Sequence, residues 1–252
     1  MIPFFRKIRK KMADDNKPIK YLRYAIGEIV LVVIGILIAL QINNWNENRQ
    51  FEALKKELCL ELLDELQYNI DRIHFLDSST TLNYSFKSTD SLLRLKVLSL
   101  KGGLDTNEIV QLFQGSQYKY NAFNLNSDVY EQLKENKILN TLDKDIKFTI
   151  VSYYHQINRE EIYNLQSLPR ILEAYDQCKY GYQELRDAYF VDSSSYLKNH
   201  AWIFDKSSKN YIDLKNYLEV VYYNIHRNRQ RMVGIIDESE KLKKLLLTNP
   251  QY

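Results

Sequence analysis

Four histidines and two cysteines are the side chains of this 252-residue chain best suited to metal binding or nucleophilic chemistry. Zinc sites use spacings such as His-x-x-x-His and Cys-x-x-Cys, and neither occurs in the sequence. Asp71 and His74 have the i, i+3 carboxylate–histidine spacing of di-iron bundles, but such a site needs a second copy and two further glutamates. The second copy is missing, so we expect no metal and no cofactor.

Motifs for phosphate binding and for serine nucleophiles are also missing. The sequence contains no Gly-Lys-Ser/Thr phosphate loop, no Gly-x-Gly-x-x-Gly turn and no Gly-x-Ser-x-Gly elbow. We interpret Ser193–Ser195 as a polar turn. Cys59 and Cys178 leave two possibilities open, a disulfide in an exported protein or two small buried thiols. The sequence thus favours a protein that is not an enzyme.

Long helices are the elements that must carry these residues. The chain has only seven glycines and four prolines, which are too few turn-forming residues for a meander of short strands. Apolar residues recur at spacings of three and four from Phe51 to Ile73 and again from Tyr211 to Leu246, as on one face of a helix. The predicted fold class is therefore all-α, with one domain built as an antiparallel helical bundle.

Several boundaries between these helices follow from the sequence. Ser127 and Asp143 are predicted N-caps, and Pro169 is expected to kink or end the helix that contains it. Further predictions are helices over 88–100, 105–115 and 170–188, a loop over 116–126 and a buried cluster at 202–204.

One apolar stretch, Tyr24 to Ile42, carries most of the information about function. Its 19 residues include a single formal charge, Glu28, and as a helix they span about 28 Å, close to one hydrocarbon core. A signal peptide has a shorter apolar core that ends at a small-x-small cleavage site, and none follows here. The sequence predicts an uncleaved transmembrane helix over 24–45.

Charge predicts the orientation of this helix. Residues 1–23 hold eight cations against two acids, whereas residues 46–252 hold 27 cations against 29 acids. Because the basic flank stays in the cytoplasm, residues 1–23 form a cytoplasmic tail and residues 46–252 an extracytoplasmic, periplasmic domain of a single-pass inner-membrane protein. The near-neutral domain gives no electrostatic case for nucleic-acid binding.

One face of the transmembrane helix is a candidate for self-association. Glu28, Gly35 and Ala39 lie on one side, and Gly35 with Ala39 forms a small-x-x-x-small pair that lets two backbones approach closely. The alternative is that Glu28 snorkels to Lys20 or Arg23 at the cytoplasmic interface.

Five segments resemble a family of uncharacterised bacterial single-pass membrane proteins, DUF6090. They are Tyr24–Glu47, Phe4–Arg9, Ser88–Leu93, Tyr130–Lys134 and the pair Tyr153–Tyr154. The resemblance implies a one-pass protein with a helical outer domain and supplies no activity.

Two functions remain after these exclusions. The preferred one is a membrane-anchored scaffold or accessory subunit at the bacterial envelope, whose partners are the lipid bilayer and a second copy or another membrane protein. The alternative is an extracytoplasmic ligand-binding or sensory bundle that signals through a partner, since a tail of 23 residues is too short for a signalling module.

Overall fold

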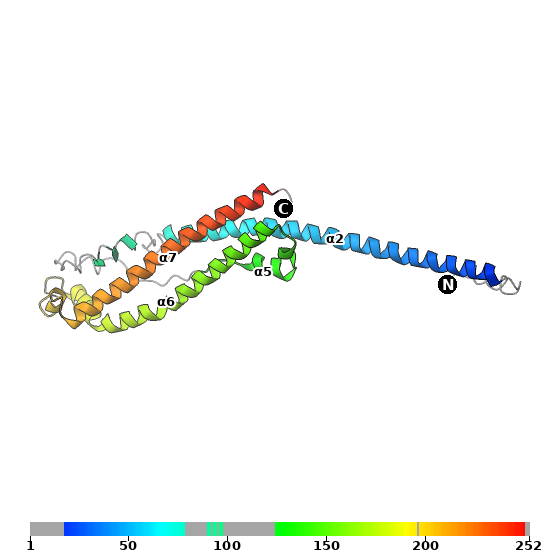
Figure 1. Cartoon of the computed structure of the whole chain (residues 1–252). Helices are drawn as coiled ribbons and strands as arrows, with labels where there is room; N and C mark the ends of the chain where they lie inside the picture. Colours follow the sequence, from blue (N-terminus) through cyan, green and yellow to red (C-terminus); the bar gives the residue numbers. More distant parts are fainter. Residues whose placement is uncertain are drawn as a thin grey trace. The chain divides into compact units, whose positions relative to one another are not determined.

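The described part of the chain consists mainly of helices (Figure 1). The computed structural model describes residues 18–78, 90, 91, 93, 94, 96, 97, 124–195 and 197–249. No strand occurs among these residues, which confirms the predicted all-α class. The helices are α2 (Pro18–Ser78), α5 (Asp128–Glu135), α6 (Lys144–Val191) and α7 (Lys209–Thr248), with short 3-10 helices η2 (Ile138–Asn140) and η3 (Ala201–Phe204).

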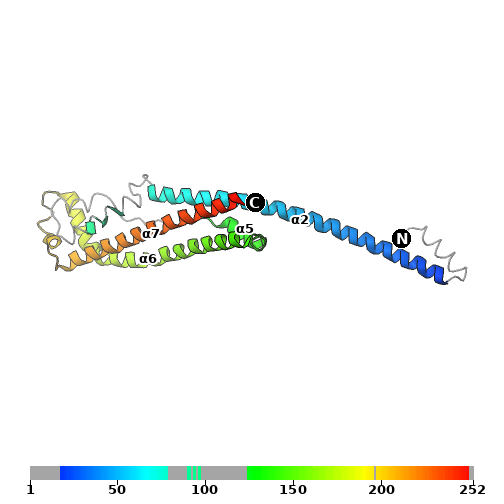
Figure 2. The ribbon, with the colours of Figure 1, turned by 45° about the horizontal axis from the view of Figure 1, so that its top comes forward.

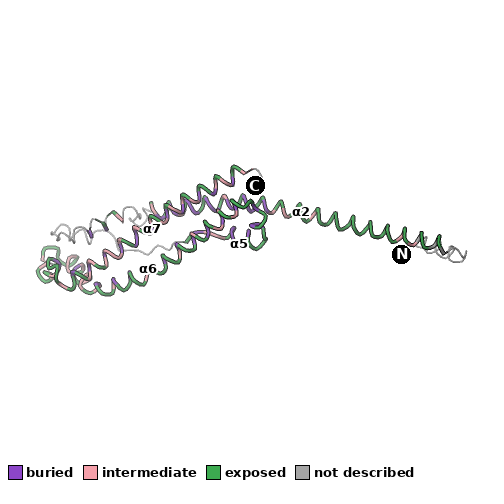
Figure 3. Tube along the Cα trace, viewed as in Figure 1, coloured by how far each residue is buried: buried purple, intermediate pink, exposed green. Residues whose placement is uncertain are grey.

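The chain divides into two compact units, residues 1–57 and 58–252. In the first unit, every residue of α2 from Ile29 to Trp45 is exposed (Figure 3). An 18-residue window of this helix has a mean hydropathy of 2.6, and none of it is buried. By length and composition, the helix is therefore able to cross a membrane.

In the second unit, α6 and α7 lie side by side and run in opposite directions (Figures 1 and 2). Glu160 of α6 pairs with Arg231 of α7, and Ser167 accepts a hydrogen bond from Asn224. As the residue number rises along α6, the number of its contact on α7 falls. The two long helices thus form the antiparallel pair that the sequence predicted.

The part of α2 that belongs to the second unit is also antiparallel to α7. Lys243 Nζ donates to Gln67 Oε1 at 2.5 Å, and Arg229 Nε lies 3.5 Å from Asp77 Oδ1. The buried residues of this part of α2 are mainly leucine and isoleucine, on the stripe that the sequence showed. They include Leu58, Leu62, Leu66, Ile70 and Ile73.

The buried face of α7 follows a seven-residue repeat along the whole helix. Its members recur at alternating spacings of three and four, the pattern of coiled-coil core positions. They are Tyr211, Leu214, Leu218, Val221, Ile225, Asn228, Met232, Ile235, Ser239, Leu242 and Leu246. Since nine of these eleven are apolar or aromatic, Asn228 and Ser239 mark the places where polar groups enter the core face.

The helix starts show which of the predicted caps are made. Asp143 caps α6 by accepting a hydrogen bond from the amide of Asp145, as predicted. Ser127 stands at the N-cap position of α5, as predicted, although its hydroxyl makes no capping bond. The carboxylate of Glu65 and the amide oxygen of Asn126 accept from the α5 amides instead.

Pro169 does not end its helix, because α6 continues to Val191. A proline inside a helix removes the amide that would bind the carbonyl four residues earlier, here that of Leu165. The packing of Ile171, Ala174, Cys178 and Leu185 after the proline compensates for that loss. A separate helix beginning at Arg170 was therefore a wrong expectation.

Three further expectations concern residues 202–204, 88–100 and 105–126. In the 202–204 cluster, Ile203 is buried, whereas Phe204 is 48 % exposed. The described residues between 90 and 97 are helical, with Leu93 and Val97 buried. The helix expected over 105–115 and most of the loop over 116–126 lie outside the described residues.

Candidate functional site

The structure does not assemble the histidines and cysteines into a reactive site. His74 and His155 are exposed, and His226 Nδ1 lies 3.2 Å from an oxygen of Asp90. Among the described residues, no group of three metal-ligating side chains could hold an ion. Both cysteines are buried and are not joined in a disulfide, and burial raises the pKa of the Cys178 thiol to about 12. A thiol with such a pKa is a poor nucleophile.

The Ser193–Ser195 segment is a turn, as predicted. Ser194 and Ser195 donate hydrogen bonds from their hydroxyls to the carboxylate of Asp192. These two bonds, with a further one from the Ser194 amide, lower the pKa of Asp192 to about 2. The serines therefore serve the turn.

The predicted association face lies on the exposed part of α2. Glu28 is half-buried, whereas Gly35 and Ala39 are exposed. A methyl group added at Gly35 would meet no described atom within 4 Å beyond its chain neighbours and the backbone of its own helix. The surface around Gly35 is thus open to a second helix, and the association face stays a prediction.

A cluster of buried polar side chains joins α2, α5, α6 and α7. Glu65 accepts from the Tyr154 hydroxyl and, at 2.9 Å, from the backbone amide of Val129. Asn69, one turn further along α2, exchanges two hydrogen bonds with the backbone of Asn126, at 2.7 and 2.9 Å. We call the group of Glu65, Asn69, Tyr153, Tyr154 and Ser239 the Glu65 cluster.

The tyrosines of this cluster connect two of the segments that carry the family resemblance. The ring of Tyr130 stacks on that of Tyr154, with centroids 4.4 Å apart and planes at 8°. The Tyr153 hydroxyl accepts from Ser239 Oγ at 2.9 Å and lies 3.4 Å from Asn69 Nδ2. The resemblance therefore reflects, at least here, residues that hold the core together.

Burial decides the ionisation of the Glu65 cluster. It raises the pKa of the Glu65 carboxyl above its ordinary value, although the bonds from Tyr154 and Val129 act in the opposite direction. Burial and the nearby Glu65 charge also raise the pKa of the Tyr154 hydroxyl. With these groups bonded to one another inside the bundle, we assign the cluster a structural role.

An open groove runs between α6 and α7, and we call it the α6–α7 groove. It has two connected parts, of about 640 and 400 Å³, which share the side chains of Tyr163, Arg227 and Arg231. Further lining residues come from both helices: Gln156, Glu160, Gln166, Ser167, Arg170, Ile171, Val220, Tyr223, Asn224, Gln230 and Gly234. Most of the lining side chains carry a polar group.

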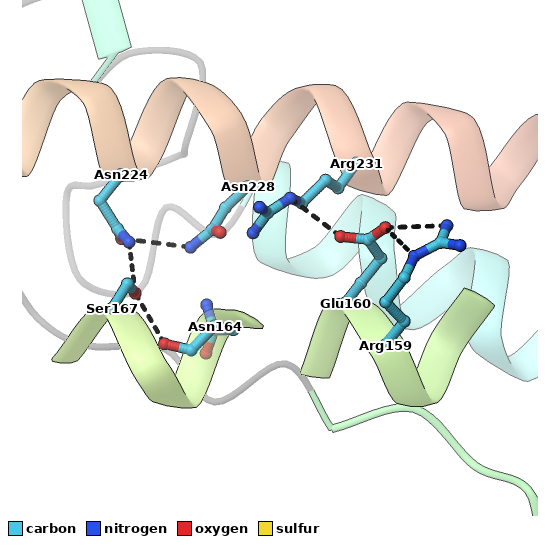
Figure 4. Close-up of polar contacts among 7 residues, drawn as sticks. All are labelled: Arg159, Glu160, Asn164, Ser167, Asn224, Asn228 and Arg231. Carbon is cyan, nitrogen blue, oxygen red and sulfur yellow. Dashed lines mark hydrogen bonds and ion pairs between the residues drawn. The ribbon is translucent and has the colours of Figure 1, made fainter. Parts of the chain in front are cut away.

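Three arginines and one glutamate set the charge of this groove. Glu160 is buried between Arg159, whose nitrogens lie 3.2 Å from Oε1, and Arg231, whose Nε lies 2.9 Å from Oε2 (Figure 4). Arg231 Cζ also lies 5.1 Å from the centre of the Tyr163 ring. Within the described part of the chain, Arg170 and Arg227 have neither an ion-pair nor a hydrogen-bond partner.

Buried amides continue the polar character of the groove into the helix interface. Asn224 donates to the hydroxyl of Ser167, and Asn228 donates to Asn224 at 3.2 Å (Figure 4). The side-chain oxygen of Asn164 is buried and has no hydrogen-bond partner among the described residues. The interface of α6 and α7 is thus polar over about two helical turns, between apolar stretches on either side.

The sequence did not point to the Glu65 cluster or to the α6–α7 groove. A signal for the groove existed in the stripe of α7, where the apolar residues Ile225 and Met232 are seven apart and leave a position open between them. Asn228 occupies that position. The groove arginines carry no such signal, since charges on a helix usually face solvent.

Comparisons with known proteins give a family and no activity. The model described as "Family of unknown function (DUF6090)" matches residues 28–180, which is more than half of the chain. The match includes α5 and most of α6, and it ends before α7 begins. No curated protein and no solved structure matches the chain.

Proposed function

Because the chain belongs to the DUF6090 family, whose function is unknown, we propose from its own structure that it is a membrane-anchored, non-enzymatic scaffold or accessory subunit of the bacterial cell envelope. The observation that carries the proposal is the apolar stretch of α2, which no other part of the described chain covers. Exposed apolar surface of this length is unfavourable in water and favourable in a bilayer.

The proposed location is the cytoplasmic membrane, with the N-terminus inside and the bundle in the periplasm. Eight cations before the apolar stretch and a near-neutral bundle after it support this orientation. The assignment as a non-enzyme is supported by the Glu65 cluster, in which the perturbed groups bind one another inside the core.

Self-association through the face of Glu28, Gly35 and Ala39 is the part of this proposal that can be tested most directly. Two differently tagged copies of the full chain are co-expressed, and the membranes are solubilised gently. Capture of one tag should recover the other. Gly35→Ile places a branched side chain where two backbones would meet, and we expect recovery to fall strongly, by on the order of 1 kcal/mol or more in association free energy.

Gly27→Ile is the matched control, because it adds the same atoms to the same helix on a face that is rotated by about 80° around the helix axis from Gly35. A Cβ at Gly27 also meets no described atom within 4 Å beyond its chain neighbours and the backbone of its own helix. Equal recovery for wild type and both variants would show that the Gly35 face points to lipid. No recovery from wild type and no stoichiometric membrane partner would contradict the scaffold function.

A second candidate function, a ligand-binding or sensory bundle that signals through a partner, is favoured by one specific observation. The α6–α7 groove interrupts an otherwise apolar helix interface with polar and charged groups. A scaffold needs no such groove, whereas a sensor needs a place for its ligand.

A further inference from the structure

We propose that the α6–α7 groove binds a small anion through its carboxylate or phosphate groups, with Arg170, Arg227 and Arg231 as the binding residues. The inference names a ligand class for the second candidate function and is independent of the self-association proposed above. It rests on three features of the groove: its polar core positions, its uncompensated charge and the side chains that surround its arginines.

The polar core positions are the first feature. The buried residues of α6 also recur at spacings of three and four, and Glu160 and Asn164 take positions in this repeat that are apolar elsewhere, at Ile150, Ile157, Ile171 and Ala174. On α7, Asn228 occupies the corresponding kind of position. Apolar residues there would close the interface and would be at least as stable, because buried ion pairs gain little over packed hydrocarbon. The polar residues are therefore explained better by a polar site than by stability.

Uncompensated charge is the second feature. Arg231 is paired with Glu160, and the same carboxylate is also contacted by Arg159. Arg170 and Arg227 line the same part of the groove, with no acidic partner in the described part of the chain. The groove lining thus holds three cations and one acid, and the missing negative charge is what a bound anion would bring.

The side chains that surround these arginines define the ligand further. A guanidinium presents two parallel N–H groups that match carboxylate and phosphate oxygens. Tyr163 and Tyr223 flank the arginines, and Gln166 and Gln230 add amide groups that can donate or accept hydrogen bonds. The groove is open along its length, so we expect a small polar anion that exchanges readily with solvent.

The test uses the full chain in lipid nanodiscs and isothermal titration calorimetry with two probes, inorganic phosphate and citrate. Sodium chloride at equal ionic strength provides the baseline. We expect at least one probe to bind, and Arg227→Gln and Arg170→Gln to weaken its affinity by roughly tenfold or more each, since each removes a charge-assisted contact.

Lys244→Gln is the matched control, because it removes one positive charge from an exposed position on the same helix α7, outside the groove lining. Its affinity should stay within about twofold of wild type, as expected for a screened surface charge. Circular dichroism and thermal unfolding verify that each variant is folded.

Each outcome of the titration bears on the site. Binding of phosphate alone or of citrate alone, lost in the arginine variants, supports the site. It also shows whether the site prefers phosphate or carboxylate groups. Absence of binding by both probes overturns the proposal, as does unchanged affinity in the folded arginine variants. Equal weakening by Lys244→Gln and the arginine variants also overturns it, because the effect would then belong to the net charge of the bundle.

Discussion

Glu65 stands at the centre of contacts that sequence separation alone would not suggest. Its carboxylate reaches an amide of α5 that is 64 residues away and a tyrosine of α6 that is 89 residues away. A buried carboxylate of this kind favours its protonated form, because burial penalises the charge. Glu65 therefore ties the stability of the bundle to pH.

The sign of this dependence follows from the raised pKa. Since the pKa of Glu65 is raised in the folded protein above its ordinary value of 4.5, the folded state binds a proton more tightly than the unfolded state. Its contribution to stability is fully present below pH 4.5 and is lost as the pH rises through the pKa of the folded protein. A tenfold difference in proton affinity between the two states corresponds to about 1.4 kcal/mol.

We predict that Glu65→Gln removes this part of the pH dependence. Glutamine has the same shape, and its amide group can still pair with one of the two partners of Glu65, Val129 or Tyr154. Chemical denaturation of both proteins between neutral pH and pH 4.5 measures the effect. The stability of wild type relative to Glu65→Gln should increase as the pH falls. A difference that is constant over this range would contradict the assignment.

The long helices pair through the buried residues of their seven-residue repeat. We expect the polar residues within that repeat to make the bundle less stable than apolar residues would. Asn228 is buried on the core face of α7, and its side chain donates to Asn224 at 3.2 Å. A leucine at this place would bury apolar surface worth about 1.5–3 kcal/mol and lose a hydrogen bond worth about 0.5–1.5 kcal/mol.

Asn228→Leu should therefore raise the free energy of unfolding by on the order of 1 kcal/mol. Urea denaturation of the full chain in detergent measures the change. Asn158→Leu makes the same exchange at an exposed position of α6 and should stay within about 0.5 kcal/mol of wild type. A clear loss of stability in Asn228→Leu would show that the asparagine is needed to fix the register of the two helices.

The same repeat explains how far the fold could be predicted from the sequence. All nine apolar or aromatic residues of the α7 stripe from Tyr211 to Leu246 are buried, because period alone places them on one face. Glu65 as a cap for α5 could not be predicted, since it depends on tertiary packing across 64 residues. The groove could not be predicted either, because the sequence does not show whether Arg170 and Arg227 have an acidic side chain nearby in the folded protein.

Pro169 illustrates the opposite failure. Local preference alone would break α6, but buried residues on both sides of the proline, such as Ile157 and Ile171, keep the helix on the same core face. Packing over 48 residues outweighs a penalty of about 3 kcal/mol at one position.

For the proposed membrane anchorage, the decisive question is on which side of the membrane the bundle lies. We predict that alkaline phosphatase fused after Tyr252 is active, because a basic N-terminal flank favours a cytoplasmic N-terminus and this enzyme folds only where its disulfides can form. A reporter that folds only in the cytoplasm, fused at the same position, is the control and should be inactive. The reverse pattern would place the bundle in the cytoplasm.

The seven-residue repeat of α7 also restricts how the chain can change in length. One inserted residue turns every later side chain by about 100° around the helix, which moves the whole following stripe off the core. Seven inserted residues turn it by only about 20° and leave the stripe nearly in place. We therefore expect α6 and α7 to tolerate insertions and deletions only in steps of seven residues, made in both helices together, so that the two helices change length as a pair.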